Sequence, residues 1–252
     1  MTSLNASFLH DTNGGVHADI NHHKEKPYRV HGGPIQHGWS PYELNGGSVL
    51  AIAGDDYVVV AADMRLVRGY SILSRKTSRL HEMTDKAVLG TGGCHTDVVT
   101  LHKTLDICCA MYEHNHQEKM GTRSLSQLLG NTLYYRRFFP YYAFNILAGL
   151  DEEGKGAVYG YDAVGSFQRQ PDGISANGSA MKLIMPLLDN IVGFKNRTDG
   201  DRRVYTAEEA VELVKEGFVT AGERDINCGD AVEIKVITKD GITTEIFELK
   251  KD

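Results

Sequence analysis

Two apolar runs near the start of the chain predict a buried hairpin. Ser48–Ala53 and Tyr57–Ala62 consist mostly of Val, Ile, Leu and Ala, and the turn Gly54-Asp-Asp joins them. Apolar residues fill both runs instead of every second position, which indicates a sheet that is covered on both faces. Asp63 and Arg65 stand where the second strand ends.

Apolar residues that recur every three or four positions predict two helices in the middle of the chain. The first runs from about His95 to His116, and His102 falls off its apolar stripe, so we expect this side chain to face solvent. The second runs from Ser124 to about Phe138, with Tyr134 on its buried side and Pro140 ending it.

Two further helices are predicted in the second half of the chain. Gly178–Ile191 carries an apolar stripe, and Pro186 is expected to bend this helix or to end its first part. Thr206 begins the next helix as its N-cap, and Glu209 three residues later completes a capping box. This last helix is expected to run to about Glu223.

The remaining apolar runs predict strands. They are Ser71–Ser78, Lys86–Gly92, Tyr142–Leu150, Ala157–Tyr161 and a closing hairpin of Ala231–Thr238 with Ile242–Leu249. The chain therefore alternates strands, a helix pair, strands, a helix pair and strands. Two sheets packed face to face, with one helix pair outside each, cover every apolar face. We therefore expect an α/β (α+β) fold in four layers, an αββα sandwich.

Length and charge narrow the class of protein. The chain has 252 residues, of which 41% are hydrophobic and 24% charged, as expected for one large globular domain, here residues 38–252. The net charge is −6 and no long run of Lys and Arg occurs, so we expect no nucleic-acid partner. No apolar run is long enough to cross a membrane and no signal pattern begins the chain, which favours cytoplasm and nucleus.

Cysteine usage fits an intracellular protein. None of the four cysteines forms a C-x-x-C motif, so we expect reduced thiols, mostly buried. They are Cys94, Cys108, Cys109 and Cys228.

Residues 1–37 differ from the rest of the chain. They are polar, with no helical or strand period, and we expect them to be a disordered extension or propeptide. A histidine-rich metal-binding module is the alternative for this segment, although no spacing repeats and no cysteine joins the histidines. The six histidines are His10, His17, His22, His23, His31 and His37.

Several motifs resemble one protein family. The hairpin that closes on A-A-D-x-R at residues 61–65 and E-R-D-I-N-C-G-D-A-V at 223–232 are similar to motifs of the β-type subunits of the 20S proteasome, which are N-terminal nucleophile hydrolases. R-R-F-F-P-Y-Y at 136–142, G-L-D-E-E-G-K-G at 149–156 and P-L-L-D-N at 186–190 resemble the sixth β type of eukaryotes, which does not cut peptides. The resemblance covers about Trp39 to Asp252 and implies the same αββα sandwich.

The resemblance implies a site that has lost its chemistry. In active members a threonine begins the first strand, and its hydroxyl attacks the peptide carbonyl while its own amino group takes the proton. The matching position is Gly47, so the attacking atom is missing. An aspartate after the second strand is kept as Asp63, but the lysine that tunes the amine is matched by Arg79, which does not release its proton. The family's serine and its Asp…Ser pair are matched by Asn177, Asp225 and Cys228.

The retained acidic groups also have a structural interpretation. Asp63 and Asp225 are expected to accept hydrogen bonds from nearby backbone N–H groups and to pair with Arg65 or Arg224. In that case neither carboxylate takes part in a reaction.

A second function, in another class, stays open. The chain could be a self-standing N-terminal nucleophile amidohydrolase that uses Ser48 or Cys228 on small amides. Ser48 would need cleavage after Gly47, and its side chain would then be one residue out of register. Cys228 has no histidine near it in the sequence, so we expect a buried thiol.

A subunit without chemistry contributes surfaces to an assembly. By resemblance, the partners are the fifth and seventh β types in the ring, the opposite β ring, the α ring and assembly chaperones, with no cofactor or metal. Asp162 matches a position that lines the fifth type's substrate channel, and beginning a turn to Gly165 is its structural alternative. Residues 38–42 resemble the mature start of a non-catalytic type, so we expect processing between His37 and Gly38.

Overall fold

The computed structural model describes residues 40–195, 197–198 and 203–251. The chain divides into two units, Met1–Glu43 and Leu44–Asp252, and every helix and strand of the described residues lies in the second. The expectations for residues 1–37 and for processing between His37 and Gly38 lie outside the described residues.

The predicted opening hairpin is the centre of the first sheet. The backbone N–H of Gly54 donates to Tyr57 O at 2.9 Å and closes the turn. All pairings in this sheet are antiparallel, in the order β10-β1-β2-β11-β12. The strands are β1 (Ser48–Ala53), β2 (Tyr57–Asp63), β10 (Ile174–Gly178), β11 (Ala231–Thr238) and β12 (Gly241–Glu248).

The second sheet is also antiparallel, in the order β5-β6-β7-β8-β9. Its strands are β5 (Leu80–Thr84), β6 (Ala87–Gly93), β7 (Ala143–Leu150), β8 (Gly156–Tyr161) and β9 (Phe167–Arg169). A small two-stranded sheet is formed by β3 (Leu66–Arg68) and β4 (Ser71–Ser74), which lie between β2 and β5 in the sequence.

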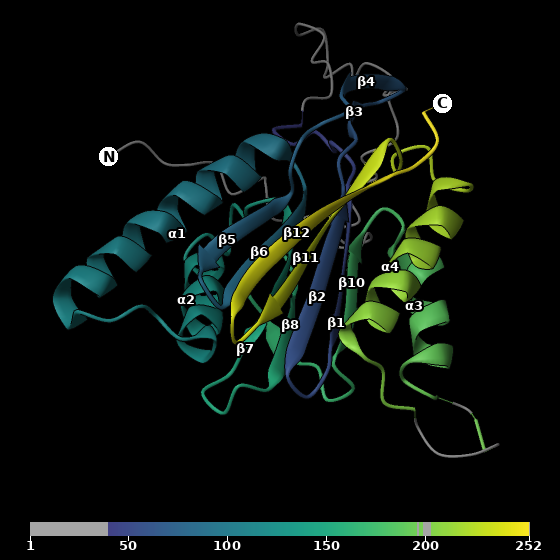
Figure 1. Cartoon of the computed structure of the whole chain (residues 1–252). Coiled ribbons are helices and arrows are strands. Elements are labelled where there is room, and N and C mark those ends of the chain that lie inside the picture. The colour runs from purple at the N-terminus through teal and green to yellow at the C-terminus, as the bar shows by residue number, and fades with distance from the viewer. Residues whose placement is uncertain (1–39, 196, 199–202, 252) are drawn as a thin grey trace, which may run out of the picture. The chain divides into compact units, whose positions relative to one another are not determined.

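Three apolar clusters hold the layers together. One cluster joins the first sheet to two helices, α3 (Met181–Ile191) and α4 (Ala207–Gly222). A second joins the other sheet to α1 (His95–His116) and α2 (Thr122–Tyr134). The third lies between the sheets and is built from alternate residues of the same strands, such as Val49 and Val58. The helix pairs therefore cover the outer faces of two packed sheets (Figure 1), as the pattern of elements predicts.

The observed helix ends agree with some of the predicted ends and differ from others. The capping box at Thr206 is confirmed, because its hydroxyl accepts from the Glu209 N–H while the Glu209 carboxylate accepts from the Thr206 N–H. Helix α2 stops at Tyr134, short of the predicted Phe138, and the Tyr134 side chain is 64% exposed, so its predicted burial is wrong. Pro186 lies inside α3 and does not end it.

Two kinds of feature escaped the sequence prediction. The prediction missed β3, β5, β9 and β10 because strands of three to five residues are too short to show a clear alternation. His102 was expected to face solvent, but it is partly buried: its ring stacks on His81, and Nε2 lies 3.0 Å from the Thr91 hydroxyl. The Thr91 hydroxyl in β6 therefore holds the His102 side chain, although His102 does not belong to the apolar stripe of α1.

Candidate functional site

Gly47 occupies the position predicted for the nucleophile, immediately before β1. Its φ is +97°, a conformation that side chains rarely adopt. A Cβ added at Gly47 would lie 2.6 Å from Nε of Arg79, closer than any ordinary contact. The guanidinium of Arg79 therefore fills the space that a nucleophilic side chain would need.

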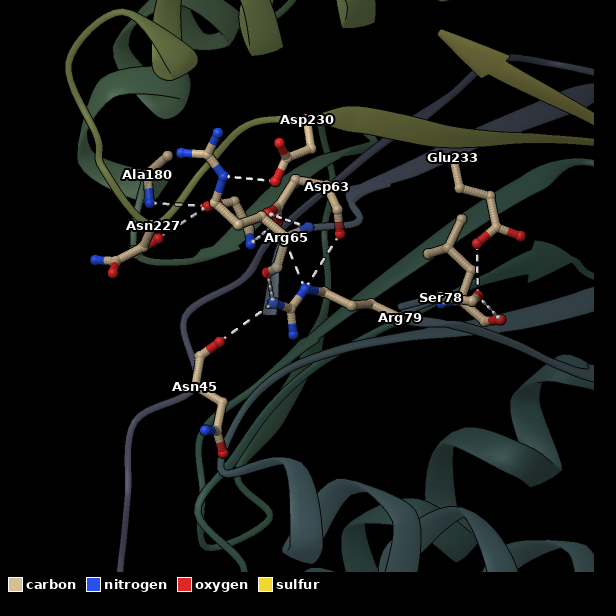
Figure 2. Close-up of polar contacts among 12 residues, drawn as sticks. Asn45, Asp63, Arg65, Ser78, Arg79, Ala180, Asn227, Asp230 and Glu233 are labelled. Atoms are coloured by element: carbon tan, nitrogen blue, oxygen red, sulfur yellow. Dashed lines mark hydrogen bonds and ion pairs between the residues drawn. The ribbon is translucent and has the colours of Figure 1, made fainter. Parts of the chain in front are cut away.

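Arg79 is buried and binds several backbone carbonyl groups. Its Nε donates to Asp63 O at 3.1 Å, and Nη2 donates to Asn45 O at 3.3 Å and to Arg65 O. Figure 2 shows the guanidinium of Arg79, the residue before β5, pointing toward these groups. Since a guanidinium keeps its proton, Arg79 cannot serve as a base and instead acts as a structural cation.

Asp63 lies fully buried at the end of β2. One carboxylate oxygen accepts the Ser48 N–H at 2.7 Å and the other accepts the Arg65 N–H at 3.3 Å, so the predicted bonds to backbone N–H groups are confirmed. Its charged neighbour is Arg79, with 3.6 Å between Nε and Oδ1. The Arg65 side chain instead pairs with Asp230 at 2.7 Å (Figure 2). Burial raises the pKa of Asp63 to about 6, although Arg79 and the two N–H groups oppose the shift.

Asn45 ties the chain upstream of Gly47 to β6, to β3 and to the start of α1. Its backbone N–H donates to Gly93 O at 3.1 Å, and its carbonyl accepts the Val67 N–H at 3.2 Å. Its side chain donates to Val67 O at 2.9 Å and accepts the His95 N–H at 2.9 Å, at the start of α1. The backbone before Gly47 is therefore built into the site. Sequence reasoning missed Asn45, since Val67, Gly93 and His95 are distant along the chain.

Ser48 uses its hydroxyl to hold the loop after β10. The Ser48 Oγ accepts the Ala180 N–H at 3.0 Å and lies 3.2 Å from the Ser179 Oγ. Ser179 also donates its backbone N–H to Gly47 O at 3.1 Å. Ser48 is completely buried, which leaves a substrate no path to its oxygen.

Ser179, and not the predicted Asn177, is the serine-type neighbour of Gly47 in the structure. The Asn177 side chain donates to Asn145 O at 2.9 Å, on the second sheet. Ser179 was missed because the sequence match placed the family's serine two residues earlier. Its N-G-S context is the signal that could have found it.

Asp225 and Cys228 belong to the loop after α4. Asp225 Oδ1 accepts the Asn227 N–H at 3.0 Å, as predicted, and the described residues give it no ion pair with Arg224. Cys228 is buried, and burial raises the pKa of its thiol far above the usual range, with further increases from Asp63 and Asp225. The thiol therefore stays protonated and unreactive. All four cysteines are free.

Comparison with known proteins identifies the family. The family described as Proteasome subunit matches residues 43–237. The chain is 48% identical over 229 residues to proteasome subunit beta type-1-B of Carassius auratus, which covers 91% of this chain and 95% of that protein. It is 51% identical over 219 residues to proteasome subunit beta type-1 of Arabidopsis thaliana, which covers 85% of this chain and 97% of that protein. It is 46% identical over 216 residues to proteasome subunit beta type-1 of Drosophila melanogaster, which covers 85% of this chain and 91% of that protein. The chain belongs to the proteasome subunit family.

Membership of this family confirms the resemblance that the motifs predicted, down to the β type. The motifs match Gly47 to the nucleophile position of this family. The structure brings Gly47, Asp63, Arg79, Asp225 and Cys228 close together and puts Asn177 on the neighbouring strand. Asp63 and Arg79 pair with each other and bind backbone groups, and none of the residues named here exposes a hydroxyl, thiol or amine.

Asp162 lies apart from these groups, in the turn between β8 and β9. Its Oδ1 accepts the N–H groups of Val164 at 3.0 Å and Ser166 at 2.8 Å, so the side chain closes its own turn. The residue is exposed, and Oδ2 makes no hydrogen bond within the described part of the chain. One oxygen therefore remains available to a partner.

Within the described residues, no group of three or more His, Cys, Asp or Glu side chains could hold a metal ion. None of the described helices is long and apolar enough to cross a membrane.

Proposed function

We propose that this chain is a catalytically silent β subunit of the 20S proteasome core particle, which supports assembly of the β ring and thereby ubiquitin-dependent protein degradation. The Carassius auratus and Arabidopsis thaliana relatives that it matches along most of their length are named β type-1 proteasome subunits. The proposal places the chain in cytoplasm and nucleus, without a cofactor.

One observation supports the proposal that the subunit has no catalytic activity. The Arg79 guanidinium fills the side-chain space at Gly47, and the backbone carbonyls of Asn45, Asp63 and Arg65 hold it there. Restoring a threonine alone would force two groups into one volume, so the loss of chemistry involves the surrounding packing as well as the missing hydroxyl. Neither Ser48 nor Cys228 offers a free nucleophile, and no observation favours an amidohydrolase.

Assembly can be tested with a tagged chain in cells. Native gel separation, followed by intact-mass and N-terminal analysis, should find the chain in a large particle with an N-terminus near Gly38, upstream of Gly47. A small free species that begins at Ser48 would contradict the proposal and would favour a serine hydrolase.

The proposed partners follow from the family. They are the fifth and seventh β types as ring neighbours, subunits of the opposite β ring and of the α ring, and assembly chaperones. A ring of related subunits uses two different surfaces of each member, one for each neighbour.

We further propose that Asp162 lines the substrate channel of the fifth β type. Its exposed Oδ2 can accept a hydrogen bond from a peptide amide while Oδ1 keeps the turn closed. In purified particles, Asp162→Asn should raise KM for chymotrypsin-like cleavage a few-fold and leave kcat unchanged, because the amide keeps the turn but removes the charge. Asp240→Asn, in the exposed β11–β12 turn, is the control. Unaltered kinetics for Asp162→Asn would remove the idea.

A further inference from the structure

The segment Tyr134–Phe139, which we call the aromatic turn, exposes four large aromatic side chains between α2 and β7. Tyr135 is 91% exposed and Phe138 97%, and Tyr134 and Phe139 are also mostly in solvent. Tyr, Phe and Arg are the residue types that are enriched at protein interfaces. Six consecutive residues of these types are therefore an unusual surface for a protein that acts alone.

The backbone holds the aromatic turn in a defined shape. The N–H of Arg136 donates to Leu133 O at 3.1 Å, that of Arg137 to Tyr134 O at 3.0 Å, and that of Phe139 to Arg136 O at 3.1 Å. These successive turns continue directly from the last turn of α2. Because the backbone is already ordered, docking of this surface would cost little conformational entropy.

The charge of the aromatic turn indicates the chemistry of its partner. Arg136 lies over the Tyr141 ring at 4.7 Å and Arg137 over the Phe138 ring at 5.9 Å. Neither guanidinium forms an ion pair with a carboxylate of the described residues. The turn therefore presents two cations on an aromatic surface, which a partner with apolar side chains and carboxylates would complement.

The aromatic turn is continuous with the surface that carries Asp162. A Cβ added at Gly165, in the same turn as Asp162, would lie 3.1 Å from the Tyr134 N and would also contact Gly130 O. The Tyr161 hydroxyl donates to Ser126 O at 2.8 Å and fixes the end of β8 against α2. A neighbour that reaches Asp162 therefore also meets the end of α2.

The size of the surface is suitable for a subunit contact. Four aromatic side chains with this exposure offer on the order of 600 Å². A specific interface buries about 800 Å² on each partner. The aromatic turn together with the Asp162 turn would supply most of that area.

We infer that the aromatic turn docks into an acidic, apolar groove of the neighbouring β-type subunit on the side of Asp162. This inference rests on the proposed function, since it needs a ring neighbour, and it extends that proposal by naming the surface and the chemistry of the contact. Phe138 and Tyr135 enter the groove, and Arg136 and Arg137 pair with carboxylates at its edge.

Photo-crosslinking in the assembled particle tests the contact. A benzoylphenylalanine in place of Phe138 should crosslink to one identified β-type subunit, in a peptide that contains Asp or Glu. The same residue in place of Val204, which is also exposed, is the control and should not yield that crosslink. A crosslink to an α subunit, a chaperone or a second copy of this chain would overturn the inference, and so would a chain that enters the particle without any crosslink at Phe138. A chain that never enters a particle would overturn the proposed function as well. Failure of the inferred contact alone can therefore be distinguished from failure of the proposed function.

A charge reversal tests the acidic character of the groove. The variant Arg136→Glu/Arg137→Glu should lower incorporation into particles about tenfold, because like charges would face each other. Lys239→Glu in the exposed β11–β12 turn should leave incorporation unchanged. Equal incorporation of both variants would contradict the charge argument.

Discussion

The Gly47 region and the aromatic turn differ in whether their charged side chains have bonding partners within the chain. Around Gly47, charged side chains are buried and bonded to one another and to backbone carbonyls. In the aromatic turn, apolar rings and two arginines face outward with no acidic partner among the described residues. The first region contributes to folding and the second remains available for contact. This difference supports the proposal that the chain contributes to its assembly through its surface and not through chemistry.

The largest expected effect comes from removing the buried cation. Arg79→Met should lower the free energy of unfolding by about 3 to 5 kcal/mol, because Asp63 and three carbonyls would lose their partner. Urea unfolding of the purified full chain measures it. The control Arg169→Met removes an exposed ion pair with Asp151 and should cost less than about 1 kcal/mol. Equal effects for the two variants would contradict the structural role of Arg79.

The next effect isolates the crowding at Gly47. Gly47→Ala should cost about 2 to 4 kcal/mol, from its positive φ together with the contact between the new Cβ and Arg79. Gly154→Ala is a matched control, because Gly154 also has a positive φ, +80°, but has open space around it. It should cost about 1 kcal/mol. If the two variants lose the same stability, Arg79 does not fill the site.

The next prediction concerns the pH dependence of stability that the partly buried His102 side chain causes. Burial lowers the pKa of His102 to about 4, with a further decrease from His81, and Asp106 opposes it. Since the unfolded chain takes up this proton near pH 6.5 and the folded chain does not, stability is present above pH 6.5 and is lost as the pH falls toward 4. The loss should reach about 3 kcal/mol.

His102→Gln provides the reference for this titration, since glutamine keeps a polar group but has no proton to gain. Unfolding free energies of the full chain, measured between pH 7 and pH 4, should fall more steeply for the unsubstituted chain than for His102→Gln. Parallel curves would show that His102 is already accessible to protons in the folded state.

The smallest expected effect concerns the aromatic turn. Phe138→Ser should change the free energy of unfolding of the isolated full chain by less than about 0.5 kcal/mol, because its ring makes few contacts. A loss above about 1.5 kcal/mol in urea unfolding would mean that the ring packs within the chain. The difference between the two regions would then disappear.

Much of the architecture could be predicted from the sequence because its signals are local. The apolar runs of the opening hairpin, the period of α1 and the capping box at Thr206 each act within one element. The sequence itself gives a glycine at position 47 and an arginine at position 79, but only the structure shows that one fills the space beside the other.

The rest depends on contacts between distant parts of the chain. Arg79 reaches Asn45 O over 34 positions, and Ser48 reaches the Ser179 hydroxyl over 131, so no local pattern records either contact. His102 and Tyr134 show the same limit. Helical periodicity assigns each a face, but the polar partner on the sheet and the end of α2 decide their exposure.

The central claim is that this chain has no working nucleophile. Particles that contain it can be treated with a peptide electrophile that labels N-terminal threonines, and each subunit can then be weighed by intact-mass analysis. The account predicts that active β subunits gain the mass of the probe while this chain keeps its own mass. A covalent adduct on this chain, mapped to Ser48 or Cys228, would contradict the account.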